Sequence, residues 1–189
     1  MHHALLLAGG KSSRMGQDKS RLEIEGRTLL DRSLDLLRQT GAGRVLISGD
    51  VSGYDCIPDL LPDCGPLGGL HAVMHTLDME DALDGSPLLV IPVDMPQLDS
   101  KTLTRLLDSL DKSEACHYEN EIFPCVFRLS EKLKAHLDYL FAEDKTLGGK
   151  RSMRALLSLF SEKPLSTTTL PKQVFKNLNY SEEWEQFRK

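Results

Sequence analysis

The chain of 189 residues has the length of one ordinary domain, and we expect a single domain over residues 1–189. Its composition, 40% hydrophobic and 27% charged, excludes a disordered, collagen-like or coiled-coil protein. The formal net charge of −5 argues against a nucleic-acid-binding protein, although a local basic cluster can still hold a small phosphorylated ligand. No apolar run approaches the roughly 20 residues that cross a bilayer, and no signal peptide precedes the first apolar run. We therefore expect a cytoplasmic protein without a membrane segment.

In the first half of the chain, short apolar runs alternate with amphipathic segments, which is the pattern of an α/β fold. The run at residues 88–93 is apolar throughout, as expected for a strand buried on both faces. Strands are predicted over residues 3–7, 44–48 and 88–93, with 56–57 as a candidate for one more. Helices are predicted over residues 29–37, 67–77 and 99–110, the last with Asp99 as its N-cap.

The second half is less regular. Two short apolar runs, residues 115–118 and 122–127, are separated by turn-forming residues and predict a hairpin. Helices are predicted over residues 130–141 and 152–160, and a final helix begins at Ser181, whose hydroxyl can cap it. Basic residues follow the first of these helices, and they form either a solvated face or a site for a phosphate or an acidic partner. They are Lys145, Lys150, Arg151 and Arg154.

The cysteines give no sign of a metal or redox site. Their separations do not produce a C-x-x-C motif, so we expect four reduced thiols. They are Cys56, Cys64, Cys116 and Cys125.

The segment after the first predicted strand, residues 7–19, reads LAGGKSSRMGQDK. Gly9 and Gly10 allow the backbone to approach a ligand closely, and their amides can face oxyanions. Arg14 and Lys19 add positive charge. This combination predicts a polyphosphate-binding loop.

Two common phosphate-binding motifs do not account for this loop. A P-loop requires a glycine five positions before Gly10, where this chain has Leu5. A dinucleotide fingerprint requires G-x-G-x-x-G, but the glycines fall at positions 9, 10 and 16. Both motifs are therefore excluded.

The pattern L-A-G-G-x(3)-R-M-G-x-D-K, which residues 7–19 match in full, resembles the signature of the molybdenum cofactor guanylyltransferases, nucleotidyltransferases that act on molybdopterin. Three further segments match in the family's order: G-P-L-G-G at residues 65–69, P-V-D-M-P at 92–96 and F-K-N-L-N at 175–179. The resemblance covers nearly the whole chain. It implies an α/β fold, a three-layer Rossmann-like sandwich with a mainly parallel mixed sheet, of the nucleotide-diphospho-sugar transferase type.

Asp94 is the candidate metal ligand. It follows a predicted buried strand, and ligands of open α/β sheets bind at the carboxyl ends of the strands. Magnesium is commonly held by one or two carboxylates together with substrate phosphates. We therefore expect Asp94 to hold Mg²⁺, the one cofactor predicted.

The resemblance implies transfer of GMP from GTP to the phosphate of molybdopterin, with or without molybdenum, and release of pyrophosphate. Its implied catalytic residues are Lys19, Arg14 and Asp94, of which the two cations neutralise developing negative charge. The implied nucleotide-binding residues are Leu7, Ala8, Gly9, Gly10, Lys19, Ser48, Asp59, Gly65 and Asp94.

Two features of the matched pattern leave roles open. Some relatives carry Asn at the position of Ser48, whose hydroxyl has a shorter reach. Asn177 and Asn179 alternate on an expected strand, so both side chains would lie on one face. There the two amides either bind the pterin side of the substrate or pin the strand to a loop.

A sibling enzyme is the first alternative, either a molybdopterin cytidylyltransferase or a sugar- or polyol-phosphate nucleotidyltransferase. Relatives that use CTP tend to carry L-A-A-G, whereas this chain has Gly9 followed by Gly10, which favours GTP. A noncatalytic nucleotide-binding adaptor is the second alternative, but Lys19 and Asp94, whose loss would mark one, are both present. Besides GTP and molybdopterin, the resemblance implies carrier and insertion proteins of the molybdenum cofactor as partners. We expect a monomer or weak oligomer.

His71 and His75 have the i, i+4 spacing of the zinc protease helix. Ala72 stands where that helix has its general-base Glu, and no third ligand is evident in the sequence. The sequence therefore does not predict zinc.

Overall fold

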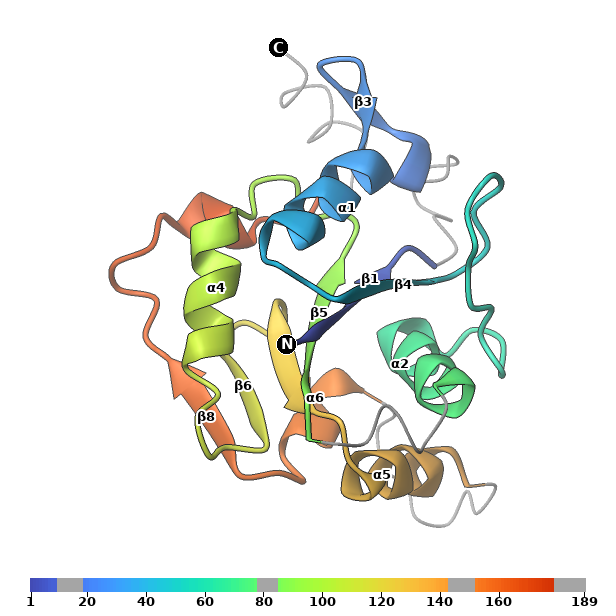
Figure 1. The fold of residues 1–189 in the computed structure, drawn as a ribbon, viewed down its shortest axis with the longest axis vertical. Helices are drawn as coiled ribbons and strands as arrows, with labels where there is room; N and C mark the ends of the chain where they lie inside the picture. Colours follow the sequence, from blue (N-terminus) through green and yellow to red (C-terminus); the bar gives the residue numbers. More distant parts are fainter. Residues whose placement is uncertain (10–18, 78–84, 143–151, 179–189) are drawn as a thin grey trace.

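A six-stranded mixed sheet forms the centre of the computed structural model, which describes residues 1–9, 19–77, 85–142 and 152–178 (Figure 1). The order of the strands is β4-β1-β5-β7-β6-β8, and only β7 runs against the direction of the other five. The strands are β1 (His3–Leu7), β4 (Arg44–Ser48), β5 (Pro87–Pro92), β6 (Ala115–Tyr118), β7 (Cys125–Arg128) and β8 (Glu162–Leu165). The expected mainly parallel mixed sheet is confirmed.

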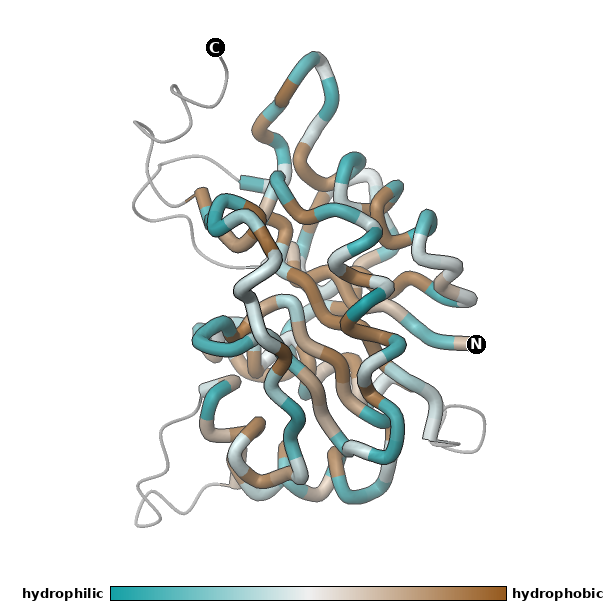
Figure 2. Tube along the Cα trace, turned by 90° about the vertical axis from the view of Figure 1, so that its left-hand side faces the viewer, coloured by the Kyte–Doolittle hydropathy of each residue, from teal (hydrophilic) through white to brown (hydrophobic). Residues whose placement is uncertain are grey.

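Helices cover both faces of this sheet, which gives the expected three layers (Figure 1). Side chains of β1 alternate between the two cores: Ala4 and Leu6 pack with α1 and α4, whereas Leu5 and Leu7 pack with α2 and α5. Figure 2 shows hydrophobic residues along the central strands. The helices are α1 (Leu29–Gln39), α2 (Gly65–Thr76), α4 (Ser100–Asp108), α5 (Glu131–Phe141) and α6 (Met153–Leu157), with the 3₁₀ helices η1 (Lys19–Arg21) and η3 (Lys172–Phe175).

Side-chain caps fix the starts of four helices. Thr28, Asp99, Ser130 and Ser152 each accept a hydrogen bond from the backbone N–H three residues further on. Each bond satisfies an amide that the first helical turn leaves without an intrahelical partner. The predicted N-cap at Asp99 is confirmed, with an Oδ1–N distance of 2.7 Å to Thr102.

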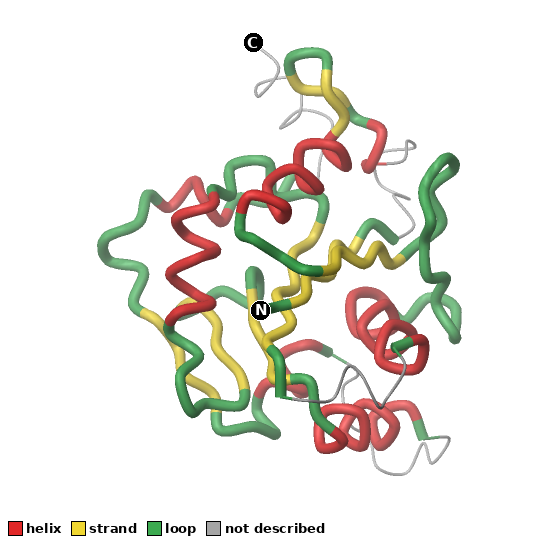
Figure 3. Tube along the Cα trace, viewed as in Figure 1, coloured by secondary structure: helices red, strands yellow, loops and turns green. Residues whose placement is uncertain are grey.

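The structure corrects several sequence expectations. The candidate strand at residues 56–57 is a single bridge between Ser48 and Ile57, and the strand expected from residue 122 begins at Cys125. The helix expected over residues 152–160 ends at Leu157. Neither β8 nor the small antiparallel hairpin of β2 (Glu23–Ile24) and β3 (Arg27–Thr28) was expected (Figure 3). The helix predicted from residue 181 lies outside the described residues.

The cysteines are free thiols, as expected. Cys116 and Cys125 are buried, and burial raises the pKa of Cys116 to about 11. Both buried groups therefore stay protonated at neutral pH and belong to the core. None of the helices in the described ranges combines the length and the apolar character that a bilayer crossing requires.

The order of the strands creates a switch point beside β1. The chain forms β1 first, then β4 on one side of it, then β5 on the other. In open α/β sheets, ligands bind at such a reversal, outside the carboxyl ends of the strands. The residues that follow β1, β4 and β5 therefore mark the expected site.

Candidate functional site

A lysine and an aspartate from distant parts of the chain meet at the switch point. Val93 donates its backbone N–H to the carbonyl oxygen of Leu7 (3.0 Å), which keeps the ends of β1 and β5 together. Asp94 follows, and its Oδ2 lies 2.8 Å from Nζ of Lys19. The Asp94 side chain is 16% exposed and the Lys19 side chain is 20% exposed, so both charges are largely shielded from solvent but still reachable. The structure thus brings together two of the three predicted catalytic residues.

The C-terminal segment is attached to the same aspartate. Leu178 donates its N–H to the carbonyl oxygen of Asp94 (2.8 Å), and the preceding Phe175 is buried. Asn177 is exposed between these two anchors, beside the site. Residues 176–178 form no strand, so the expected strand face for Asn177 is wrong; Asn179 lies outside the described residues. The anchoring explains how Leu178, 84 residues beyond Asp94, brings its segment to the site.

The ends of β1 and β4 approach so closely that a Cβ at Gly49 would clash and one at Gly9 would be tight. The N–H of Ala8 donates to the carbonyl oxygen of Ser48 (2.8 Å). A Cβ on Gly9 would lie 3.2 Å from Cα of Gly49, and one on Gly49 would lie 2.7 Å from N of Gly9. Gly49 also has a φ of +136°, which strains any other residue. Gly49 was not among the predicted site residues, although it directly follows the strand predicted over residues 44–48.

Ser48 and Asp59 form a polar pair beside this approach. The Ser48 hydroxyl donates to Oδ1 of Asp59 (3.4 Å). Desolvation raises the pKa of Asp59, and the hydrogen bond from Ser48 opposes that shift. Asp59 keeps a solvent-exposed surface, so the pair is placed to meet a ligand.

The first turn of α2 packs against this pair. A Cβ on Gly69 would lie 2.2 Å from Oγ of Ser48, and one on Gly68 would lie 3.3 Å from Oδ2 of Asp59. Gly65 is exposed and has a φ of +59°, a conformation that favours glycine. The N-cap residue, Cys64, makes no side-chain cap hydrogen bond. The amides at this helix start therefore add partial positive charge to the candidate site.

Most predicted binding residues thus gather at one edge of the sheet. Gly10 and Arg14 lie outside the described residues, so their predicted roles stay predictions. The gathered residues are Leu7, Ala8, Gly9, Lys19, Ser48, Asp59, Gly65 and Asp94, with Asn177 beside them. Among the described residues, this edge offers one cation, two carboxylates and backbone amides, which are the groups that bind a metal–polyphosphate ligand.

Comparisons with known proteins identify the family of this chain. Residues 4–163 match the model of the MobA-like NTP transferase domain. The chain is 38% identical over 180 residues to the molybdenum cofactor guanylyltransferase of Xanthomonas euvesicatoria pv. vesicatoria, covering 95% of this chain and 90% of the relative. A second molybdenum cofactor guanylyltransferase, from Rhizobium meliloti, is 31% identical over 199 residues, with 97% and 88% covered.

The fold has a solved counterpart in the molybdopterin-guanine dinucleotide biosynthesis protein A of Archaeoglobus fulgidus. The TM-score is 0.74 at 18% identity, and the match covers 98% of this chain and 96% of that one. At that identity the likeness shows the fold. With the family match spanning most of the sequence, the chain belongs to the MobA-like NTP transferase domain family.

Proposed function

We propose that this protein transfers GMP from GTP to the terminal phosphate of molybdopterin, forming molybdopterin guanine dinucleotide and releasing pyrophosphate. The observation that carries the proposal is the Lys19–Asp94 pair at the switch point, directly beside the end of β1. This pair stands in a chain 38% identical to a protein named molybdenum cofactor guanylyltransferase. The proposed nucleotidyltransferase domain spans residues 1–189 and acts in the cytoplasm.

The reaction replaces one phosphorus–oxygen bond by another. A phosphate oxygen of molybdopterin attacks the α-phosphorus of GTP while the bond to the β-phosphate oxygen breaks, and the electron pair leaves with pyrophosphate. A phosphate monoester is largely ionised near pH 7, because its second pKa is about 6. No side chain therefore has to remove a proton from the attacking group. The difficulty is to bring two anions together, and this is the task of the positive groups.

Lys19 is the described cation at the reacting end. Its Nζ is held 2.8 Å from Asp94 before substrate arrives, so its position is fixed in advance. We propose that Lys19 then donates to phosphate oxygens and stabilises the charge that develops on them. Arg14 is proposed to assist it. The amides of Gly9 and Gly10 and those at the start of α2 are proposed to hold the β- and γ-phosphates.

Asp94 fits a divalent cation. Its Oδ1 accepts no hydrogen bond from the part of the chain that the structure describes, while Oδ2 holds Lys19. One such carboxylate together with substrate phosphates is a typical donor set for Mg²⁺. When bound there, Mg²⁺ would withdraw charge from the phosphates of GTP and favour departure of pyrophosphate.

The choice of GTP over CTP is part of the proposal. Gly9 occupies the position where the resemblance expects Ala in enzymes that use CTP. A Cβ there would come within 3.2 Å of Gly49, so the glycine keeps β1 and β4 close at the nucleotide edge. Ser48 and Asp59 are proposed as the polar groups that contact the nucleoside.

A nucleotide panel tests the proposal. Purified full-length protein is mixed with Mg²⁺, molybdopterin freshly released from a carrier, and GTP, CTP, ATP or UTP in turn. Release of pyrophosphate and the mass of the pterin product are measured. A guanylated pterin from GTP alone is the expected result. Turnover with CTP, or binding of GTP without turnover, would contradict the proposal in favour of a cytidylyltransferase or an adaptor.

Variants of Asp94 and Lys19, each with a matched control, test the proposed roles of these two residues. We expect Asp94→Asn and Lys19→Ala to lower turnover at least ~100-fold, the size of losing one transition-state contact. Both should keep the parent's circular dichroism spectrum. Exposed residues of α4 supply matched controls, Asp108→Asn and Lys101→Ala, which should turn over as the parent does. Near-normal activity of either site variant would remove that residue from the mechanism.

A further inference from the structure

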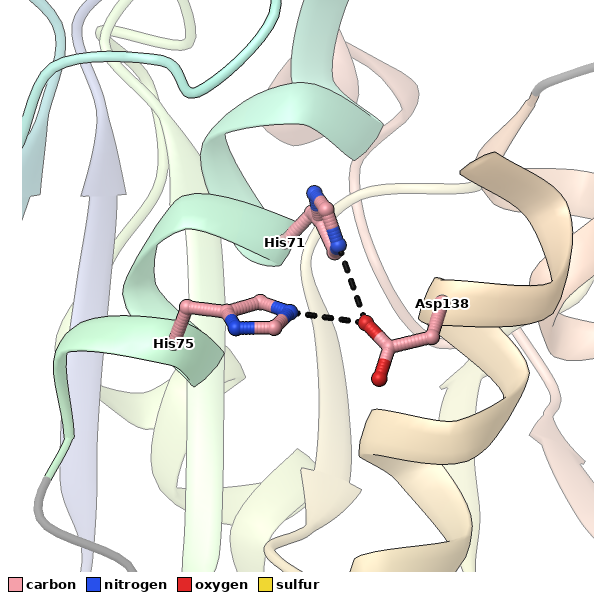
Figure 4. Close-up of side chains that lie close together, drawn as sticks. All are labelled: His71, His75 and Asp138. Carbon is pink, nitrogen blue, oxygen red and sulfur yellow. Dashed lines mark hydrogen bonds and ion pairs between the residues drawn. The ribbon is translucent and has the colours of Figure 1, made fainter. Parts of the chain in front are cut away.

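Two histidines in the C-terminal half of α2 meet an aspartate of a neighbouring helix. His71 and His75 lie one turn apart on α2, and Asp138 lies on α5, which packs beside it (Figure 4). Oδ1 of Asp138 lies 3.1 Å from Nε2 of His71 and 2.7 Å from Nε2 of His75. All three atoms fall within 4.8 Å of one another. The third ligand that the sequence did not reveal is therefore supplied by another helix.

We propose that His71, His75 and Asp138 form a binding site for one Zn²⁺ ion, which joins α2 to α5. Zinc ligands at about 2.0–2.1 Å in tetrahedral geometry are separated by roughly 3.3 Å. The two nitrogen–oxygen distances, 3.1 and 2.7 Å, are already near that spacing. Nε2 of His75 would have to move away from Oδ1 of Asp138 by about 0.6 Å, and His75, 36% exposed, has room to do so.

Neighbouring groups hold the most buried ligand in position. The ring of His71 stacks on Phe141 with centroids 4.4 Å apart and an interplanar angle of 14°. The ring of His75 lies edge-on to the ring of His71, with centroids 4.6 Å apart. His71 is 10% exposed, whereas Asp138 is 46% exposed. A metal ion would therefore be backed by an apolar wall and could enter from the solvent side.

The donor set selects the metal class. Two imidazole nitrogens and one carboxylate oxygen suit Zn²⁺ and neighbouring transition metals, while Mg²⁺ and Ca²⁺ require oxygen ligands. Three protein ligands leave a position for water. Gly65 and His75 lie ten positions apart on α2, about 15 Å along the helix axis. The proposed zinc site shares none of its three residues with the site proposed for Mg²⁺ and GTP.

Metal titration tests the site. Full-length protein is stripped of metal with a chelator, dialysed, and titrated with ZnCl₂ by calorimetry in a reducing buffer containing excess Mg²⁺. We expect one Zn²⁺ per chain and a higher melting temperature when it is bound. No stoichiometric binding would overturn the proposal, because the cluster would then be only a hydrogen-bonded link between the two helices.

One variant separates a metal site from that link. Asp138→Asn keeps an oxygen that can accept hydrogen bonds from the histidines but removes the anionic ligand. We expect it, and His75→Ala, to weaken Zn²⁺ binding by more than ~10-fold, the least that changes around a metal site cost. Unchanged affinity in both variants would refute the site. If Asp138→Asn does not fold, His75→Ala decides, because its side chain is partly exposed.

Other metal-binding groups need matched controls. His2 and His3 are adjacent near the N-terminus, and Cys56 and Cys64 are only partly buried. The variants His2→Ala/His3→Ala and Cys56→Ser/Cys64→Ser should bind Zn²⁺ as the parent does. Loss of the single site in either control would assign the metal to those residues and overturn the proposal.

Discussion

Replacing Gly69 by Ala tests how closely α2 must approach β4. The added Cβ would lie 2.2 Å from Oγ of Ser48 and 3.0 Å from both Cβ of Ser48 and Cδ2 of Leu7. Rotation of the hydroxyl can relieve the first contact, but Cβ of Ser48 cannot rotate away. Gly69 and Ser48 are both buried, so the helix itself must shift.

Two opposing energies determine the size of the effect. Overpacking of a close-packed site costs about 1–3 kcal/mol. Alanine in a helix interior gains about 1 kcal/mol over glycine. Because three contacts of the added Cβ are too short, we expect an overpacking cost of about 2–3 kcal/mol. After the gain from alanine is subtracted, the free energy of unfolding should fall by about 1–2 kcal/mol. At about 2–4 °C per kcal/mol for a chain of this size, the melting temperature should fall by about 2–8 °C.

Urea unfolding followed by circular dichroism measures this loss. The double variant Ser48→Ala/Gly69→Ala removes the hydroxyl that lies nearest, so its loss should be smaller than the sum of the single losses by at least ~0.5 kcal/mol. Gly43→Ala is the matched control, because its Cβ would meet mainly the end of the exposed Met1 side chain. Stability of Gly69→Ala equal to or above the parent's, or strict additivity, would refute the argument.

Three further predictions concern single residues. Gly49→Ala should lose about 2 kcal/mol or more in urea unfolding, because its Cβ meets fixed backbone at 2.7 Å and its φ is +136°; an unchanged midpoint would contradict this. Asp99→Ala should lose about 1 kcal/mol with the cap of α4, whereas Asp108→Ala on the same helix should lose little. Desolvation raises the pKa of folded Asp59, so its ionisation destabilises the fold as pH rises through that pKa. Asp59→Asn should therefore be more stable than the parent near pH 7 and lose this advantage on acidification; an advantage that grows in acid would refute the sign.

The hydrophobic pattern of the sequence predicted the strands and helices in which at least one whole face is buried. Residues 88–93 were predicted as a doubly buried strand, and β5 runs from Pro87 to Pro92 with a fully buried interior. In contrast, β8 was missed because only Leu165 of its four residues is buried, and Pro164 argues against a strand except at an edge. It pairs with β6, which lies more than 40 residues earlier in the chain, and the hydrophobic periodicity of a local segment does not reveal such a pairing.

The sequence indicated which residues belong to the site, but it did not indicate which of them contact one another. The motifs indicated Lys19 and Asp94 separately, but 75 residues separate them, and nothing in the sequence states that they form an ion pair. Asp138 gave no signal at all, because one aspartate on an amphipathic helix is ordinary and its partners lie 63 and 67 residues away. Long-range pairings of this kind depend on how α2 and α5 pack, which the periodicity of either helix leaves open.

The nucleotide edge divides into a rigid frame and a charged pair. The frame consists of close contacts at Gly9, Gly49 and Gly69. An added Cβ would meet backbone at the first two positions and the side chains of Ser48 and Leu7 at the third. Substitutions there change the packing of β1, β4 and α2, so losses of stability and activity should appear together. Lys19 and Asp94 face each other as a partly exposed ion pair. Their substitution should therefore lower activity and leave the fold intact. The ratio of lost activity to lost stability therefore separates residues that shape the site from residues that act on phosphate.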